Sequence, residues 1–173
     1  MNKREKFETF YREYANKLYS VAIRMVKNHE DALDIVQECF LRAYEKWENF
    51  RGDAKVLTYL YRITMNLSYD LLKKKNRESD LELKEGMVKG SDIIDSEKKI
   101  RDDRVLEKID EEIDKLTEKQ KAIFILKTYE QLSYKEIAKI LNSKIGTIKA
   151  TYFQILQKIR KNLKEQGVIR DEV

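Results

Sequence analysis

The sequence predicts an all-α protein made of two small helical domains joined by a flexible linker, the C-terminal domain being a helix-turn-helix. Its 173 residues include no proline and only five glycines, which is too few turn-forming residues for a sandwich or barrel. Apolar residues recur at spacings of three and four in two long blocks, and no stretch alternates in the manner of a β-strand. The block boundaries give domains at residues 1–78 and 105–173, with a linker at 79–104.

The first block predicts three helices. The first carries an apolar stripe of Phe7, Phe10, Tyr11, Tyr14, Leu18, Val21, Ala22 and Met25. The second follows Asn28, Glu30 and Asp31, which suit a helix start, and its stripe is Ala32, Ile35, Val36, Cys39, Phe40, Ala43, Tyr44 and Trp47. The third follows a turn at residues 50–53, has the stripe Val56, Leu60, Ile63, Leu67 and Leu71, and is expected to end among the cations Lys73, Lys74, Lys75 and Arg77.

Residues 79–104 lose this periodicity and hold more acidic than basic residues. They predict a linker with helical character only toward its end. The units on either side, of about 75 and 70 residues, are small enough to be marginally stable on their own.

The last block predicts a helix-turn-helix. Thr117–Gln120 and Ser133–Glu136 have the pattern of capping boxes, each followed by apolar residues at helical spacing. Asn142 and Ser143 interrupt the short helix that starts after Ser133. The final helix is expected to bury Ile145, Ile148, Tyr152, Ile155, Ile159 and Leu163.

Composition argues against several classes of function. One cysteine and one histidine leave no disulfide framework and no Ser-His-Asp triad, and no phosphate-binding loop or nucleophile elbow is present, so we expect no enzyme, cofactor or metal. Cys39 lies within an apolar stripe and is expected in the core. His29, Glu30 and Asp31 fit helix capping better than metal binding. No apolar run is long enough for a membrane span and no signal peptide is evident, so we expect a soluble cytoplasmic protein.

The final helix is the best candidate for contact with DNA. With its apolar stripe turned inward, its outward side carries residue types that bind phosphate or read base edges: Lys144, Thr147, Thr151, Gln154 and Lys158. From Ile137 to Lys164 there are seven lysines and arginines and no acidic residue. The alternative is a solvated basic face on an ordinary helix hairpin.

Two further sets of residues lie in the N-terminal block. Tyr59, Tyr61, Arg62, Asn66 and Tyr69 could stack on and read unpaired bases, although most of the aromatic residues are expected to fill the core. On the second helix, the polar residues off the apolar stripe could dock a partner protein or simply be solvated: Asp34, Gln37, Glu38 and Arg42.

Taken together, three ordered segments resemble the extracytoplasmic-function (ECF) group of bacterial RNA polymerase sigma factors. Asp31–Tyr44 is similar to the polymerase-docking helix of the family, and Phe50–Asn66 to its promoter-melting segment. Leu132–Leu141 followed by Gly146–Lys149 is similar to its C-terminal helix-turn-helix. The resemblance covers nearly the whole chain and includes the position of the linker.

The resemblance implies partners and roles. RNA polymerase core would be gripped, through the clamp coiled coil of its largest subunit, by Asp34, Gln37, Glu38, Leu41 and Arg42. The −10 element of promoter DNA would be recognised and melted by Phe50, Arg51, Gly52, Asp53, Lys55, Tyr59, Arg62 and Asn66. The −35 element would be bound by Ser133, Tyr134, Lys144, Thr147, Lys149, Thr151, Gln154 and Lys158. An anti-sigma factor is expected as an inhibitory partner, without direct membrane insertion of this chain.

The sequence departs from the family pattern in its recognition helix. Where the family commonly has several arginines after Gly-Thr-Ile-Lys, this chain has Ala150–Leu156, which contains no cation. Contact with the −35 element is therefore expected to shift toward Lys144, Lys149, Lys158, Arg160 and Lys161, or to be weaker. The alternatives are a free-standing helix-turn-helix regulator that acts without polymerase and a helical interaction module with no DNA role.

Overall fold

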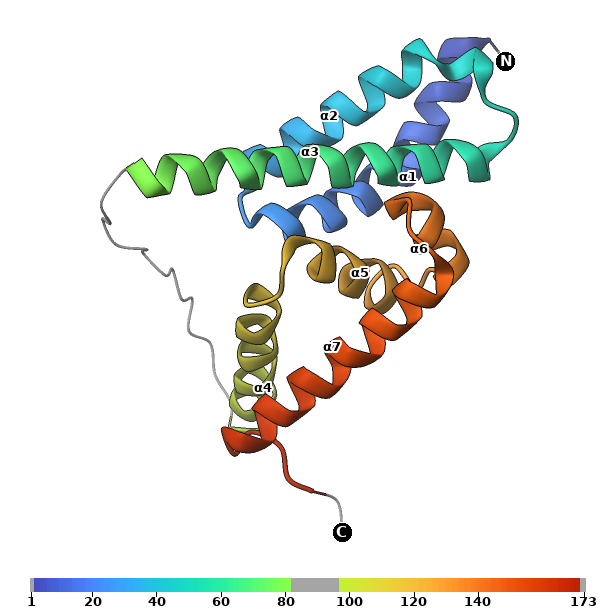
Figure 1. Cartoon of the computed structure of the whole chain (residues 1–173). Coiled ribbons are helices and arrows are strands. Elements are labelled where there is room, and N and C mark those ends of the chain that lie inside the picture. The colour runs from blue at the N-terminus through green and yellow to red at the C-terminus, as the bar shows by residue number, and fades with distance from the viewer. Residues whose placement is uncertain (1, 82–96, 172–173) are drawn as a thin grey trace.

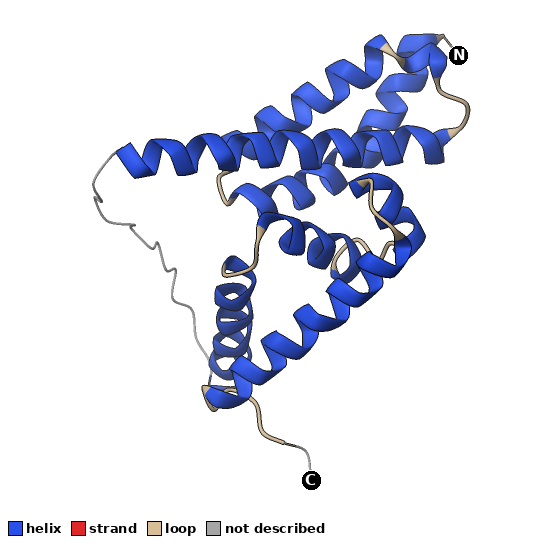
Figure 2. Ribbon diagram, viewed as in Figure 1, coloured by secondary structure: helices blue, strands red, loops and turns tan. Residues whose placement is uncertain are grey.

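The computed structural model describes residues 2–81 and 97–171 and confirms the all-helical prediction. Within this part of the chain, every regular element is a helix and no strand is present (Figure 2). Residues 82–96, which make up most of the predicted linker, lie outside the described residues, as do the side chains at 53–55, 80–81 and 97–102.

Three long helices form the N-terminal part: α1 (Lys3–Val26), α2 (His29–Glu45) and α3 (Asp53–Leu81), with a short 3-10 helix, η1 (Trp47–Asn49), between the last two. Asn28 caps α2 as predicted, because its side chain accepts a hydrogen bond from the backbone N–H of Asp31. Helix α3 continues past the predicted end among Lys73–Arg77. Its last turns contain neither glycine nor proline, so nothing in the local sequence stops the helix there.

Four helices form the C-terminal part: α4 (Glu97–Asp114), α5 (Glu118–Thr128), α6 (Tyr134–Leu141) and α7 (Ile145–Glu165). Both predicted capping boxes are confirmed. The Thr117 side chain accepts a hydrogen bond from the backbone N–H of Gln120, and the Gln120 side chain accepts one from the backbone N–H of Thr117. Ser133 and Glu136 form the same pair of hydrogen bonds at the start of α6. Because α4 begins at Glu97, the last part of the predicted linker region is helical.

The main apolar core cluster spans both parts, and the C-terminal part has a second cluster of its own. Helices α1, α2 and α3 pack against one another, and α5 and α6 pack beneath them (Figure 1). The main buried cluster joins Leu18, Cys39 and Leu60 of the first three helices to Ile125 and Ile137 of the C-terminal part. A second cluster ties α4, α5 and α7 together through Ile113, Leu116, Phe124, Ile155, Ile159 and Leu163. None of the described helices has the length and apolar character required to cross a bilayer.

Candidate polymerase and nucleic-acid interfaces

The outward face of α2 brings together all five residues predicted to dock polymerase. Their spacing of three and four places them on one side of the helix, opposite the side that packs on α1 and α3. Asp34 and Gln37 are exposed, Glu38 is half-buried, and Leu41 is 63% exposed. Arg42 Nε donates to Glu38 Oε1 at 2.7 Å, and this bond raises the pKa of Arg42. The face therefore combines carboxylates, an amide and an exposed leucine.

Two hollows that sequence reasoning did not predict border this face. One, of about 310 Å³, is mainly apolar and is lined by Phe7, Tyr11, Gln37, Phe40, Leu41 and Tyr44. The other, of about 440 Å³, is largely acidic with an apolar floor and is lined by Asp31, Asp34, Ile35, Glu38, Leu67, Asp70, Leu71 and Lys74. Each hollow needs a second helix beside α2, so the sequence of α2 alone carried no signal for it.

The residues before and at the start of α3 form a small aromatic platform. The ring of Phe50 lies 5.0 Å from that of Tyr59, tilted by 52°, and Lys46 Nζ lies 5.6 Å from the centre of the Tyr59 ring. Gly52 makes the turn into α3 with φ +93°, a conformation that side chains rarely adopt. Arg51 is exposed, whereas the side chains of Asp53 and Lys55 lie outside the described residues.

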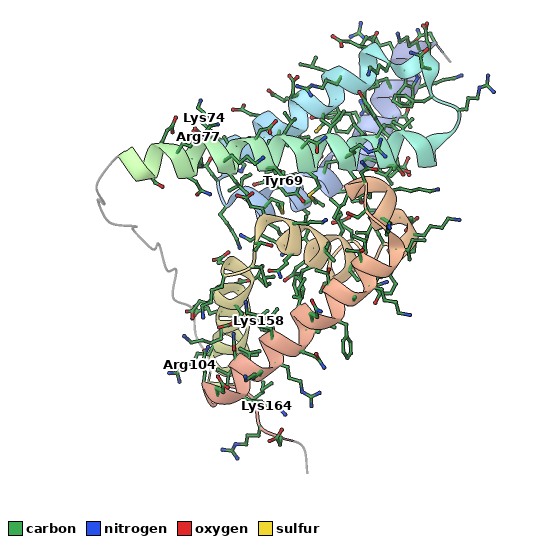
Figure 3. All side chains as sticks on the ribbon, viewed as in Figure 1. Tyr69, Lys74, Arg77, Arg104, Lys158 and Lys164 are labelled. Carbon is green, nitrogen blue, oxygen red and sulfur yellow. The ribbon has the colours of Figure 1, made fainter. Side chains whose placement is uncertain are left out.

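Farther along α3, the predicted reading residues separate into two groups. Arg62 and Asn66 are exposed and share a face with Tyr59. Tyr61 is only 1% exposed and belongs to the core, as the alternative reading of the aromatic residues allowed. Tyr69 is half-buried on the side of α3 that faces the C-terminal helices (Figure 3), and burial raises its pKa to about 12.

Helices α6 and α7 form the predicted helix-turn-helix. Asn142 ends α6 in the left-handed conformation, with φ 50°, and α7 starts three residues later. Ile137 and Ile148 are fully buried, which fixes the angle between the two helices. Ser133 caps α6 at the exposed surface, and Tyr134 is half-buried beneath Lys127 Nζ, which lies 4.3 Å from the ring centre.

The outer side of α7 carries most of the residues predicted to contact the −35 element. Lys144, Thr147, Lys149, Gln154 and Lys158 are exposed, and Thr151 is half-buried. The lysines supply positive charge for phosphate, and the exposed threonine and glutamine can reach base edges.

The inward face of α7 differs from the prediction at its first turn. Ile148, Ile155, Ile159 and Leu163 are buried, but Ile145 is 49% exposed. It stands at the N-terminus of the helix, where no neighbouring element covers it. Two apolar residues that sequence reasoning did not single out are also exposed on α7: Phe153 is 60% exposed and Leu156 is 41% exposed.

Cys39 is a core thiol, as predicted. The residue is fully buried, and its Sγ lies 3.3 Å from Thr64 Oγ1. Burial raises the pKa of the thiol to about 11. A thiol with this pKa is almost entirely protonated at neutral pH, which makes it unreactive. Among the described residues, no three histidine, cysteine, aspartate or glutamate side chains are placed to hold a metal ion.

An all-helical fold that ends in a helix-turn-helix with a cationic outer face defines the class of helix-turn-helix DNA-binding proteins. Comparison with known protein families makes this more specific. Residues 10–78 match the family described as Sigma-70 region 2, and residues 106–159 match Sigma-70, region 4.

Curated relatives agree over nearly the full length. The chain is 34% identical over 161 residues to the ECF RNA polymerase sigma factor SigW of Bacillus subtilis, covering 88% of this chain and 86% of SigW. It is 30% identical over 173 residues to the RNA polymerase sigma-H factor of Pseudomonas aeruginosa, covering 95% and 89%. The chain therefore belongs to the ECF-type sigma factors of RNA polymerase.

Solved structures share the fold. The sigma factor RpoE, solved in complex with the anti-sigma factor NepR from Bartonella quintana, superimposes with a TM-score of 0.71 at 23% identity, over 92% of this chain and 98% of RpoE. CnrH, solved in complex with the cytosolic domain of CnrY, superimposes with a TM-score of 0.66 at 17% identity, over 94% of this chain and 90% of CnrH.

Membership in this family settles the general activity. The chain is a transcription initiation factor, without enzymatic activity of its own, that binds RNA polymerase core and directs it to promoters. Region 2 serves the −10 element and region 4 serves the −35 element.

Proposed function

We propose a division of labour along the chain that follows the predicted boundaries. Residues 1–78 bind polymerase core and recognise and melt the −10 element, residues 105–173 recognise the −35 element, and residues 79–104 connect them. The observation that carries this proposal is that the exposed polar residues of α2, α3 and α7 fall within the region 2 and region 4 matches.

The polymerase contact is assigned to the outward face of α2. Its carboxylates would pair with cations of the polymerase clamp, and Leu41 would insert between them as an apolar anchor. An exposed leucine surrounded by charged groups suits a protein interface better than a solvated face, because contact removes its apolar surface from water.

The −10 contact is assigned to the exposed arc of α3 and the loop before it. The Phe50–Tyr59 platform offers a stacking surface for an unpaired base, with Arg62 and Asn66 able to contact phosphate and base edges. Extruding a base from the duplex costs a few kcal/mol, which this pocket and the polymerase contacts must offset. Asp53 and Lys55 belong to the same assignment on the basis of sequence alone.

The −35 contact is assigned to α7 and to Ser133 and Tyr134 at the start of α6. Lys144, Lys149 and Lys158 are spread along α7, so they can contact phosphates on both sides of the groove, while Thr147, Thr151 and Gln154 lie between them. Because positions 150–156 contain no arginine, this chain would prefer a −35 sequence different from that of family members that have arginines there.

Regulation is assigned to an anti-sigma factor in the cytoplasm, where core polymerase works. The similar solved structure RpoE was captured with the anti-sigma factor NepR, and CnrH was captured with the cytosolic domain of CnrY. Exposed apolar side chains on both parts of the chain, such as Leu41 and Phe153, offer anchor points for a protein of this kind.

The testing experiment is transcription by bacterial core polymerase, with and without this protein, on a library of random promoter templates. Discrete start sites that depend on the protein are expected, and alignment of the upstream sequences gives both promoter elements. A control sigma factor verifies the core preparation. If that control works and no dependent transcripts form from folded protein, the assignment is wrong for this chain acting alone.

A further inference from the structure

The outer side of α7 carries an apolar hollow among the lysines and polar residues assigned to the −35 element. The hollow has a volume of about 360 Å³ and lies where the start of α6 meets α7. Its lining includes Tyr134 of α6 and Ala150, Phe153 and Leu156 of α7. Phe153 is 60% exposed, so most of its surface contacts water in the free protein. An aromatic ring in this position is available to a ligand.

The position of Phe153 around α7 mirrors that of Gln154, which is already assigned to base edges. Lys149 and Lys158 are nine residues apart, which places them on opposite sides of a helix that turns about 100° per residue. Ala150 lies close to the middle of the exposed arc between them. Gln154 and Phe153 lie on either side of Ala150, each about 40–60° from it. With the two lysines on the phosphate backbones that border a groove, all three residues between them face the base edges.

Charge favours DNA as the occupant of this hollow. From Ile137 to Lys164 there are seven lysines and arginines and no acidic residue, so the surface around the hollow is positive. Lys149 lines the hollow itself. The major groove of duplex DNA admits an α-helix and is bordered by phosphates on both sides. A helix face that is apolar at its centre and cationic at both edges fits this groove.

Gly146 in the first turn of α7 gives a separate indication of a close neighbour outside the chain. It lies on the same side of the helix as Ala150 and Phe153. A Cβ at this position would meet no other element within 4 Å, and its φ is not positive, so the fold itself does not require glycine here. Glycine inside a helix is unfavourable relative to alanine. Its presence fits a helix whose backbone approaches a ligand closely, as a recognition helix does in a groove.

We propose that Phe153, beside the small residue Ala150, reads thymine in the −35 element by contact with the C5-methyl group of the base. The proposal rests on the assignment of the outer side of α7 to the −35 element. Thymine presents a methyl group in the major groove, and phenylalanine is one of the side chains that contact it there. The contact removes the methyl group and the ring from water together, so it selects thymine without a hydrogen bond. An anti-sigma factor anchored on Phe153 would compete with this contact directly.

The first measurement replaces thymine by uracil, one position at a time on either strand, in the −35 sequence selected in the transcription experiment. Uracil pairs as thymine does and lacks only the methyl group, so the protein stays unchanged. The affinity of holoenzyme for the promoter duplex, at fixed salt concentration, should fall roughly fourfold at one or two positions, which is the factor for one buried methyl group. A selected −35 element without thymine, or equal affinity for thymine and uracil at every position, would overturn the proposal.

The second measurement ties the effect to one side chain. Holoenzyme with Phe153→Ala should bind the thymine promoter more weakly and should no longer distinguish thymine from uracil at the sensitive position. Leu106→Ala is the matched control, because Leu106 is 58% exposed on α4, outside the assigned DNA contacts, and the thymine preference should stay near fourfold. Circular dichroism verifies that both variants fold. If Phe153→Ala keeps the full preference for thymine, another residue reads the methyl group and the proposal is wrong.

Failure of this proposal is separable from failure of the −35 assignment. Complete base-pair changes in the −35 element are compared for wild-type holoenzyme and for Gln154→Ala. If Gln154→Ala alters which base pairs are preferred while uracil has no effect, the −35 assignment of α7 holds and methyl recognition is wrong. If Gln154→Ala and Phe153→Ala both leave every base-pair preference unchanged, the assignment of α7 fails and the proposal falls with it. If Phe153→Ala instead lowers affinity for polymerase core, and equally on thymine and uracil promoters, the hollow binds protein and the proposal is overturned.

Discussion

Glu112 on α4 is a buried carboxylate that links α4 to the end of α7, and replacing it gives a sharp test of how the C-terminal helices are held together. The residue is 3% exposed. Its Oε1 accepts from Lys115 Nζ at 2.7 Å and Gln166 Nε2 at 2.9 Å, and its Oε2 accepts from Asn162 Nδ2 at 2.6 Å. Because Asn162 lies on α7 and Gln166 ends it, the carboxylate joins two helices.

The size of the effect follows from the pKa. The hydrogen bond from Lys115, followed by those from Asn162 and Gln166, lowers the pKa of Glu112 from 4.5 to about 2. One pKa unit corresponds to about 1.4 kcal/mol, so the ionised carboxylate contributes about 3 kcal/mol to the free energy of unfolding at neutral pH. A lowered pKa means that this contribution is complete above the unfolded pKa and is lost as the pH falls from about 5 toward 2.

Glu112→Gln is therefore expected to lower the free energy of unfolding by about 2–3 kcal/mol at pH 7 and by much less near pH 3. The measurement is urea denaturation followed by helical circular dichroism at both pH values. Glu111→Gln is the matched control: Glu111 pairs with Lys108 at 2.8 Å, both side chains are only half-buried, and its loss should cost at most about 1 kcal/mol. A Glu112→Gln penalty that stays constant between pH 7 and pH 3 would contradict the electrostatic argument.

Three further substitutions test the assigned DNA contacts. Asn66→Ala should impair promoter melting, measured by permanganate reactivity, more than affinity for polymerase core; equal losses would remove Asn66 from the −10 assignment. Gln154→Ala should change which −35 sequences are selected from a promoter library, and a uniform loss on all sequences would mean that Gln154 reads no base. Leu156 is an exposed residue of α7 at a position where the family commonly has a cation. Leu156→Arg should add one phosphate contact, which steepens the slope of log K against log salt concentration, for holoenzyme binding to promoter duplex, by about 0.9. Leu106→Arg adds the same charge at an exposed site on α4, outside the assigned DNA contacts, and should leave that slope unchanged. Equal slopes for the two variants would exclude a phosphate contact at position 156.

Features that depend on a few consecutive residues could be predicted from the sequence. The caps at Asn28, Thr117 and Ser133 are confirmed, because a side-chain oxygen and a backbone N–H two or three positions later meet in any helix start of this kind. The burial of Cys39 is confirmed for a similar reason, since its place in a regular apolar stripe fixes which way it points.

Features that depend on what lies beside a helix could not be predicted in the same way. Ile145 has the spacing of a buried residue, yet it is exposed because it is at the end of α7, where the neighbouring helices no longer cover the stripe. The hollows beside α2 and the bond between Tyr61 and Glu130 join residues far apart in the sequence. Periodicity shows that a helix has an apolar face, but it does not show which other helix covers that face.

Even so, the sequence of α3 did carry a signal for its packing against the C-terminal helices. Besides the stripe of Leu60 and its neighbours, the helix has a second apolar series at four-residue spacing, consisting of Leu57, Tyr61 and Met65. At 3.6 residues per turn this series lies about 100° around the helix from the first, too far for both to face α1 and α2. Tyr61 and Met65 are each 1% exposed and Leu57 is half-buried, so the second series is largely buried as well.

The width of this buried surface determines where α3 can meet DNA. Two apolar series cover more than half of its circumference, and Tyr59, Arg62 and Asn66 occupy the arc that remains. Arg62 follows Tyr61 directly, so any element that packs on the second series comes to lie beside the exposed arc. The contact of Arg62 with the Lys139 carbonyl is then a geometric consequence of burying Tyr61.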